Sequence, residues 1–162
     1  MKKLILLLSM FLCVMVGAKT LTDSEKKEML RQFSEFQQVV RNEDAKTLVT
    51  MMKFPFEDSG QIMPGDNIEP MTKQDVFDYS SSVFDFLSDL TFLSVDSDNL
   101  ATSGYIKEGN ACSLGYQGKF VGDELWIVQN FIPRLSSSCS GGYDARFKLV
   151  SKKLKLVGVN AR

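Results

Sequence analysis

The segment "YDARFKLVSKKLKLVGVNA", residues 143–161, carries the clearest structural signal in the chain. From Tyr143 onward every second residue is apolar, whereas Asp, Arg and Lys stand between them. Such alternation predicts a half-buried β-strand. After the polar "SKK" a second run follows, and its spacing places Leu154 and Leu156 on one face and Val157 and Val159 on the other. The segment therefore predicts two adjacent antiparallel strands.

Two segments upstream are also typical of strands. "ACSLGYQGKFV", residues 111–121, alternates weakly, and Gly115 and Gly118 indicate a bend or a bulge within it. "DELWIVQNFI", residues 123–132, follows directly after Gly122, and the Gly-Asp pair favours a hairpin. The four strands together predict an antiparallel meander, with one face buried against the helices expected earlier in the chain.

Helical patterns dominate the first half of the chain. In "LTDSEKKEMLRQFSEFQQVVRNED", residues 21–44, Thr22 and Glu25 have the spacing of a capping box. Apolar residues then recur at helical spacing, opposite a charged face, and this predicts an amphipathic helix. These residues are Met29, Phe33, Phe36 and Val40.

The segment after this helix predicts shorter elements. Asp44 can cap a second helix, and Pro55 is expected to end it, because the residue before a proline is pushed out of the helical region. Glycines and prolines between residues 56 and 71 indicate one or two short edge strands, and a third helix begins at Thr72. The expected fold is one α+β domain, in which N-terminal helices pack on a curved antiparallel sheet.

The first twenty residues, "MKKLILLLSMFLCVMVGAKT", match a secretory signal peptide. Two lysines precede an apolar run from Leu4 to Val16, and small residues follow. A membrane anchor is the alternative, but this run is shorter than the roughly 20 apolar residues that a span needs. We expect cleavage after Ala18, which leaves residues 19–162 as a single domain in the bacterial periplasm or the medium, without a membrane anchor.

Cleavage would leave two cysteines, Cys112 and Cys139, in an oxidising compartment. We expect a disulfide between them, which would stabilise the fold by about 3.5 kcal/mol in the chain-entropy description. A free reactive thiol or an intermolecular bridge is the alternative. The formal charge of the remaining chain, 17 basic against 20 acidic residues, is −3. Because it contains no basic run, we expect no nucleic-acid partner.

Histidine is absent from the sequence, which excludes Ser-His-Asp and Cys-His catalytic arrangements and histidine-ligated metal sites. Residues 96–99, "DSDN", have the first two ligand spacings of a calcium loop, but Ala101 and Lys107 stand where its glycine and glutamate belong. We interpret this stretch as a solvated turn. The sequence therefore predicts no catalytic residue, no metal site and no cofactor.

The order of expected elements resembles the ketosteroid-isomerase-like superfamily, which is also called nuclear-transport-factor-like. "FSEFQQVVRNEDAKTLVTMMKFPF", residues 33–56, looks like the opening of exported bacterial members, and residues 143–161 are similar to their last hairpin. The resemblance implies a cone-like fold with a pocket between helices and sheet. Its enzymes place an acid, a tyrosine or a histidine there, but none can be matched here residue by residue, so no catalytic role is carried over.

The loop "RLSSSCSGGYDAR", residues 134–146, is the best surface candidate, because it combines hydroxyls, two glycines, a tyrosine and an arginine. We expect a contact surface that includes Ser137, Ser140, Tyr143 and Arg146. It is similar to the Ser-Gly loop followed by a Tyr in periplasmic lysozyme inhibitors, although its spacing departs by one residue. The alternative is a simple connection beside the disulfide.

Two functions are compatible with these observations. The first, which we favour, is a non-catalytic binding protein for a small apolar ligand or a partner protein, a class that includes inhibitors and immunity proteins. The second is an isomerase or hydrolase that uses a carboxylate and a tyrosine. A pocket with a buried Asp or Glu within reach of a Tyr would favour the second.

Overall fold

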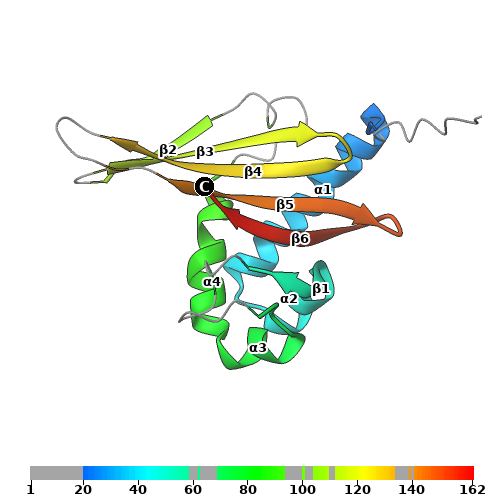
Figure 1. The fold of residues 1–162 in the computed structure, drawn as a ribbon. Helices are drawn as coiled ribbons and strands as arrows, with labels where there is room; N and C mark the ends of the chain where they lie inside the picture. The colour runs from blue at the N-terminus through cyan, green and yellow to red at the C-terminus, as the bar shows by residue number, and fades with distance from the viewer. Residues whose placement is uncertain are drawn as a thin grey trace, which may run out of the picture.

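The computed structural model describes residues 20–58, 62, 69–93, 100, 104–109, 112–133, 139 and 141–162 (Figure 1). The expected signal peptide lies outside these residues. The helices are α1 (Asp23–Arg41), α2 (Ala45–Met51), α3 (Lys73–Asp78), α4 (Ser80–Ser88) and the 3-10 helix η1 (Asp89–Phe92). The strands are β1 (Met52–Glu57), β2 (Gly104–Lys107), β3 (Cys112–Val121), β4 (Glu124–Pro133), β5 (Gly142–Val150) and β6 (Lys153–Ala161).

The α+β fold class is confirmed. Six strands form one sheet in the order β1-β6-β5-β4-β3-β2. Figure 1 shows that this sheet is curved and that the helices lie on one side of it. Strands β2 to β6 pair antiparallel with their neighbours, as the meander predicts, whereas β1 pairs parallel with β6. The sheet is therefore mixed, with an N-terminal strand added at one edge.

Helix α1 carries the helical side of the core. The capping box between Thr22 and Glu25 is present, and the apolar stripe predicted from the sequence is buried. Phe33 and Phe36 both meet Phe147 of β5 edge-on, with ring centroids 5.1 and 5.0 Å apart. Edge-to-face aromatic pairs add to the free energy gained by burial. These contacts fix α1 across the middle of the sheet.

The helices and strands differ from the sequence prediction at two places, the end of the second helix and an additional strand. The second helix ends at Met51, and Pro55 lies inside β1, not at the end of a helix. A proline is tolerated there because β1 is an edge strand. Strand β2 was not expected from the sequence, because all four of its residues are exposed and no alternation marks it.

The orientation predicted for Val159 is wrong, because β6 contains a β-bulge. Arg146 pairs with Gly158 while the next residue of β5, Phe147, pairs with Leu156. Val157 is therefore an extra residue, and it reverses the alternation after it. Val159 returns to the core and is fully buried, on the same side as Leu156.

The predicted disulfide between Cys112 and Cys139 is present, with the Cα atoms 6.3 Å apart. This separation lies within the usual range for a bridge. The bond connects the first residue of β3 to the segment before β5. No helix among the described residues is long and apolar enough to cross a membrane.

Candidate functional site

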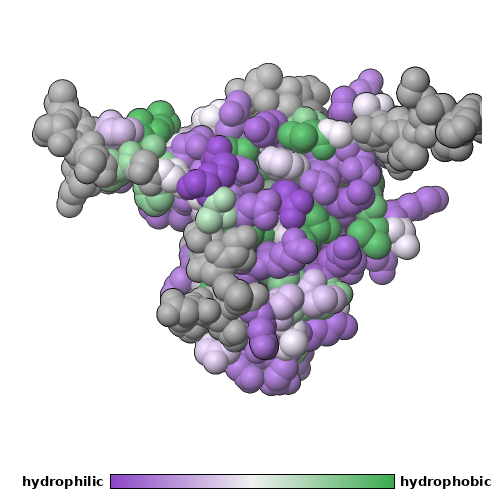
Figure 2. Space-filling view, viewed as in Figure 1, coloured by the Kyte–Doolittle hydropathy of each residue, from purple (hydrophilic) through white to green (hydrophobic). Residues whose placement is uncertain are grey.

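A pocket of about 400 Å³ opens between the helices and one end of the sheet. Phe86 of α4 and Asp89 of η1 line the helical side, whereas Gln129 of β4 and Tyr143 of β5 line the sheet side. The C-terminal end of β6 lies beside α4 in Figure 1 and closes a third side. Figure 2 shows hydrophobic residues near the end of β4, where Phe131 is 41% exposed at the pocket mouth.

The sheet side of the site holds a row of three polar side chains on adjacent strands, and two of them, Gln129 and Tyr143, line the pocket. Gln129 pairs with Tyr116 of β3 on one side and with Tyr143 of β5 on the other. All three are buried. The Gln129 side-chain amide donates to the Tyr116 hydroxyl at 3.1 Å. Directly opposed side chains on one sheet face lie close enough to interact, so the strand register itself assembles this row.

Asp89 faces this row from the first residue of η1. Its Oδ2 accepts a hydrogen bond from Gln129 Nε2 at 3.3 Å. Its Oδ1 lies 3.3 Å from the Nζ of Lys107, which extends from the edge strand β2. The Asp89 side chain is 20% exposed, so its carboxylate is accessible from the pocket. The ammonium group of Lys107 and the side-chain amide of Gln129 hold it in place.

Tyr143 has a buried hydroxyl without a hydrogen-bond partner among the described residues. Its ring packs against Phe86, with the ring centroids 4.6 Å apart. Burial raises the pKa of the Tyr143 hydroxyl, and the nearby Asp89 and Tyr116 raise it further. The phenol therefore stays protonated at neutral pH and keeps a donor for which the described residues supply no acceptor.

Tyr116 also has a raised pKa, chiefly because it is buried. The hydrogen bond from Gln129 opposes this rise, whereas the interaction with Asp89 adds to it. The site thus places one carboxylate beside two protonated phenols. Such a site can accept a hydrogen bond from a ligand at the accessible Asp89 carboxylate, whereas the enclosed Tyr143 hydroxyl can donate only to a ligand that displaces the groups covering it.

The backbone at the start of β5 packs tightly against the backbone of β4 at Gln129. This packing is possible only because Gly142 has no side chain. A Cβ atom at Gly142 would lie 2.0 Å from the carbonyl oxygen of Gln129, and its φ of +148° is one that side chains rarely adopt. Arg162 fastens the other side of the opening, donating to the Gln129 carbonyl at 2.8 Å and placing its Nε 3.0 Å from Asp144. The pocket wall therefore has a fixed backbone.

The residues expected to form a contact surface do not all come together. Ser137 and Ser140 lie outside the described residues. Tyr143 is buried on the helical face of the sheet. Arg146 lies on the opposite face, with its Nη2 3.8 Å from Glu57. Tyr143 and Arg146 lie three positions apart along one strand, so their side chains point to opposite faces of the sheet.

Part of the site could have been found in the sequence. A two-residue turn at Gly122 and Asp123 fixes the hairpin register, and that register places Tyr116 opposite Gln129. No sequence signal identifies Asp89, because its position depends on packing between distant elements.

Comparison with known proteins gives no further guide to the site. No family model matches the chain, and no significant match is found among curated proteins or among solved structures. In the described part of the chain, no three His, Cys, Asp or Glu side chains come together in a way that could hold a metal ion. The function must therefore be inferred from the geometry of the pocket.

Proposed function

We propose that the protein is an exported ligand-binding protein, whose pocket between η1, α4 and the sheet takes a small organic molecule. The observation that carries this proposal is the unpartnered, buried hydroxyl of Tyr143 beside Asp89. A buried donor without an acceptor destabilises a fold by about 1 to 3 kcal/mol. A ligand that displaces the groups covering this hydroxyl and supplies the acceptor recovers this free energy, so the ligand's polar group faces Tyr143.

The pocket lining defines the class of ligand. Phe86 and Phe131 provide apolar surface for an aromatic or aliphatic body. A carbonyl oxygen on that body would accept from Tyr143, and a hydroxyl or amine would donate to Asp89. The volume, about 400 Å³, lies within the range usual for small-molecule sites. The ligand is therefore a small, largely apolar ketone or a related carbonyl compound.

A second function is favoured by the same pair of residues. A carboxylate can remove a proton next to a carbonyl group while a protonated phenol stabilises the oxyanion that develops. Asp89 and Tyr143 have the chemistry for these two roles, and the resemblance to ketosteroid-isomerase-like proteins implies a pocket of this kind. In this alternative the protein is an isomerase that acts on carbonyl compounds.

One probe tests both functions. 2-Acetylnaphthalene has an aromatic body and a ketone, and naphthalene is the matched control without an acceptor. We expect the protein to bind the ketone more tightly, by about twofold to tenfold for one hydrogen bond, and Tyr143→Phe to remove this preference. Shifts of the Gly142 and Gln129 amide signals in NMR titrations measure both affinities.

The same samples separate binding from catalysis. In deuterated buffer, exchange of the methyl protons beside the ketone would identify proton abstraction, and Asp89→Asn should abolish it. Binding without exchange supports the binding protein. If neither compound shifts the pocket signals, or if Tyr143→Phe keeps the preference for the ketone, the proposal is wrong.

A further inference from the structure

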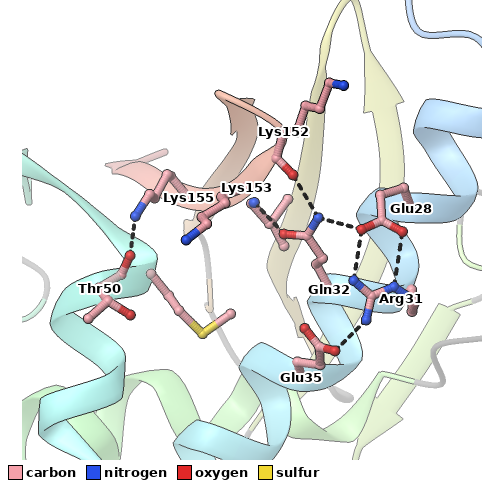
Figure 3. Close-up of a pocket in the computed structure, with 10 residues that line it drawn as sticks. Glu28, Arg31, Gln32, Glu35, Thr50, Lys152, Lys153 and Lys155 are labelled. Atoms are coloured by element: carbon pink, nitrogen blue, oxygen red, sulfur yellow. Dashed lines mark hydrogen bonds and ion pairs between the residues drawn. The ribbon is translucent and has the colours of Figure 1, made fainter.

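A second groove, of about 460 Å³, lies between α1 and the turn that joins β5 to β6 (Figure 3). Glu28, Arg31 and Glu35 of α1 form one wall, and Lys153 and Lys155 of β6 form the other. This groove shares no lining residue with the pocket beside Asp89. It is therefore a separate feature of the molecule.

The charges on the α1 wall are satisfied within that wall. Arg31 donates to Glu28 Oε1 at 2.7 Å and also pairs with Glu35. Hydrogen bonds from Arg31, and then from Gln32, lower the pKa of Glu28 to about 2. Both carboxylates are thus held in ion pairs with Arg31, on the solvent-exposed side of the helix.

The lysines on the opposite wall have no such partners. Lys152, Lys153 and Lys155 make no ion pair with any carboxylate in the described chain, and Lys155 Nζ donates to the carbonyl oxygen of Thr50. The charged groups that face the groove are Lys153, Lys155 and Arg31 against the two carboxylates, a formal charge of +1. Figure 3 shows Lys153 and Lys155 extending to the same side of the groove, whereas the ammonium group of Lys152 points away.

The lysine wall is held in place by Gln32, which is buried in α1. Its amide nitrogen donates to the Lys152 carbonyl at 2.9 Å, and its amide oxygen accepts from the Leu154 N–H at 2.6 Å. These two bonds fasten the turn and the start of β6 to the helix. The groove is consequently preorganised, which lowers the ordering cost of binding.

The backbone of the turn is unusual for its sequence. Ser151 and Lys152 both have positive φ, at 51° and 66°. Two-residue hairpin turns of this geometry favour Asn-Gly, because other residues are strained in the left-handed region. Here the hydrogen bond from Gln32 to the Lys152 carbonyl holds the turn in this strained conformation. The next residue, Lys153, then lines the groove.

We propose that this groove binds a small organic or inorganic dianion through Lys153 and Lys155. Two ammonium groups without carboxylate partners match two negative charges, and the pairing of both carboxylates with Arg31 leaves the positive charge of the lysine wall to favour an anion over a cation. The ligand's negative group is a phosphate monoester or a pair of carboxylates, since both carry this charge at neutral pH. The carboxylate of Glu35, on the facing wall, can accept a hydroxyl of the same ligand.

NMR titration of the folded protein at low ionic strength tests this proposal, with inorganic phosphate and succinate as separate probes. We expect the Lys153 and Leu154 amide signals to shift with at least one of the two. Preference for phosphate identifies a phosphate-bearing ligand, and preference for succinate identifies a dicarboxylate. Lys153→Gln should weaken binding by about threefold or more, as removal of an ion pair does.

Two further variants make the test specific. Lys152→Gln is the matched control, since it removes the same charge from the same turn but from an ammonium group that faces away from the groove. We expect it to leave the affinity unchanged, whereas Glu35→Gln should strengthen binding. The proposal is overturned if neither probe shifts these signals at millimolar concentration, or if Lys152→Gln and Lys153→Gln weaken binding equally.

Discussion

The side-chain amide of Gln37, buried in α1, donates to the carbonyl oxygen of Leu90 at 2.6 Å. The same amide donates to the carbonyl of Leu93 at 3.0 Å. One glutamine therefore binds η1 and the residue that follows it. Because η1 begins at Asp89, the position of the pocket carboxylate depends on a side chain of the first helix.

Replacement of Gln37 by Leu should destabilise the protein. The change leaves two buried carbonyl groups without donors, and we expect the free energy of unfolding to fall by about 2 kcal/mol. Urea unfolding followed by circular dichroism measures this loss. Gln38→Leu is the matched control, because Gln38 is exposed on the same helix. Equal stability of the two variants would contradict the role assigned to Gln37.

Removal of the two phenolic hydroxyls should have opposite effects on stability. Tyr143→Phe deletes a buried hydroxyl without a partner and should raise the free energy of unfolding by about 1 kcal/mol. Tyr116→Phe deletes the acceptor of the Gln129 hydrogen bond and should lower it by a similar amount. Thermal unfolding of both variants provides the measurement. A loss of stability in Tyr143→Phe would show that its hydroxyl is bonded in the folded protein.

The raised pKa of Tyr143 predicts a loss of stability in alkaline solution. In the unfolded chain the hydroxyl ionises near pH 10, whereas burial keeps it protonated in the folded protein. Above about pH 10 the unfolded state therefore binds fewer protons, and stability falls as the pH rises. The contribution is complete below this pH and is lost as the pH approaches the folded-state pKa.

Unfolding by urea at a series of pH values from about 9 to 11 measures this slope around the ordinary tyrosine pKa. Tyr143→Phe should make the decline shallower than in the unmodified protein. Tyr79→Phe is the control, because Tyr79 is 42% exposed. If both variants show the same slope, Tyr143 does not carry the effect.

The bridge between Cys112 and Cys139 should stabilise the domain substantially. It closes a loop with a sequence separation of 27 residues. Replacement of both cysteines by serine should lower the free energy of unfolding by about 3.5 kcal/mol. Denaturant unfolding of the variant tests the magnitude, and labelling of the unfolded but unreduced protein tests the bond. Two reactive thiols under those conditions would be incompatible with the bridge.

The N-terminal segment should be absent from the exported protein. We expect intact-mass measurement of the mature chain to show Lys19 as its first residue, since the apolar run before Ala18 has the layout of a cleaved signal. A mass that retains residues 1–18 would refute cleavage at this position.

The sequence predicts those elements whose pattern records which face is buried. Alternation from Tyr143 to Leu149 identifies β5 because one side of that strand packs against Phe33 and Phe36. Strand β2 has no alternating pattern of this kind, since both of its faces are exposed. The bulge at Val157 also has no signal in the sequence, because it shifts the register of pairing without an obvious change in composition.

The residues of the pocket also differ in whether the sequence predicts their positions. Tyr116 and Gln129 meet because a short hairpin fixes their register, and that register can be read from the turn. Asp89 lies beside Gln129 because tertiary packing places η1 there, and the bond of Gln37 to η1 spans 53 residues of sequence. A tertiary contact of this kind has no local signature. The contact surface expected around the serine-rich loop stays a prediction, because Ser137 and Ser140 lie outside the described residues, although Tyr143 is buried.

The position of β6 between β1 and β5 also determines when the molecule can finish folding. A polypeptide emerges N-terminus first, so β1 is made early and has no partner strand until residues 153–161 have appeared. Helix α1 can pack against Phe147 of β5 before that point, but β1 cannot join the sheet. Completion of the sheet therefore waits for the synthesis of residues 153–161, so β1 stays an unpaired edge until the last strand has formed.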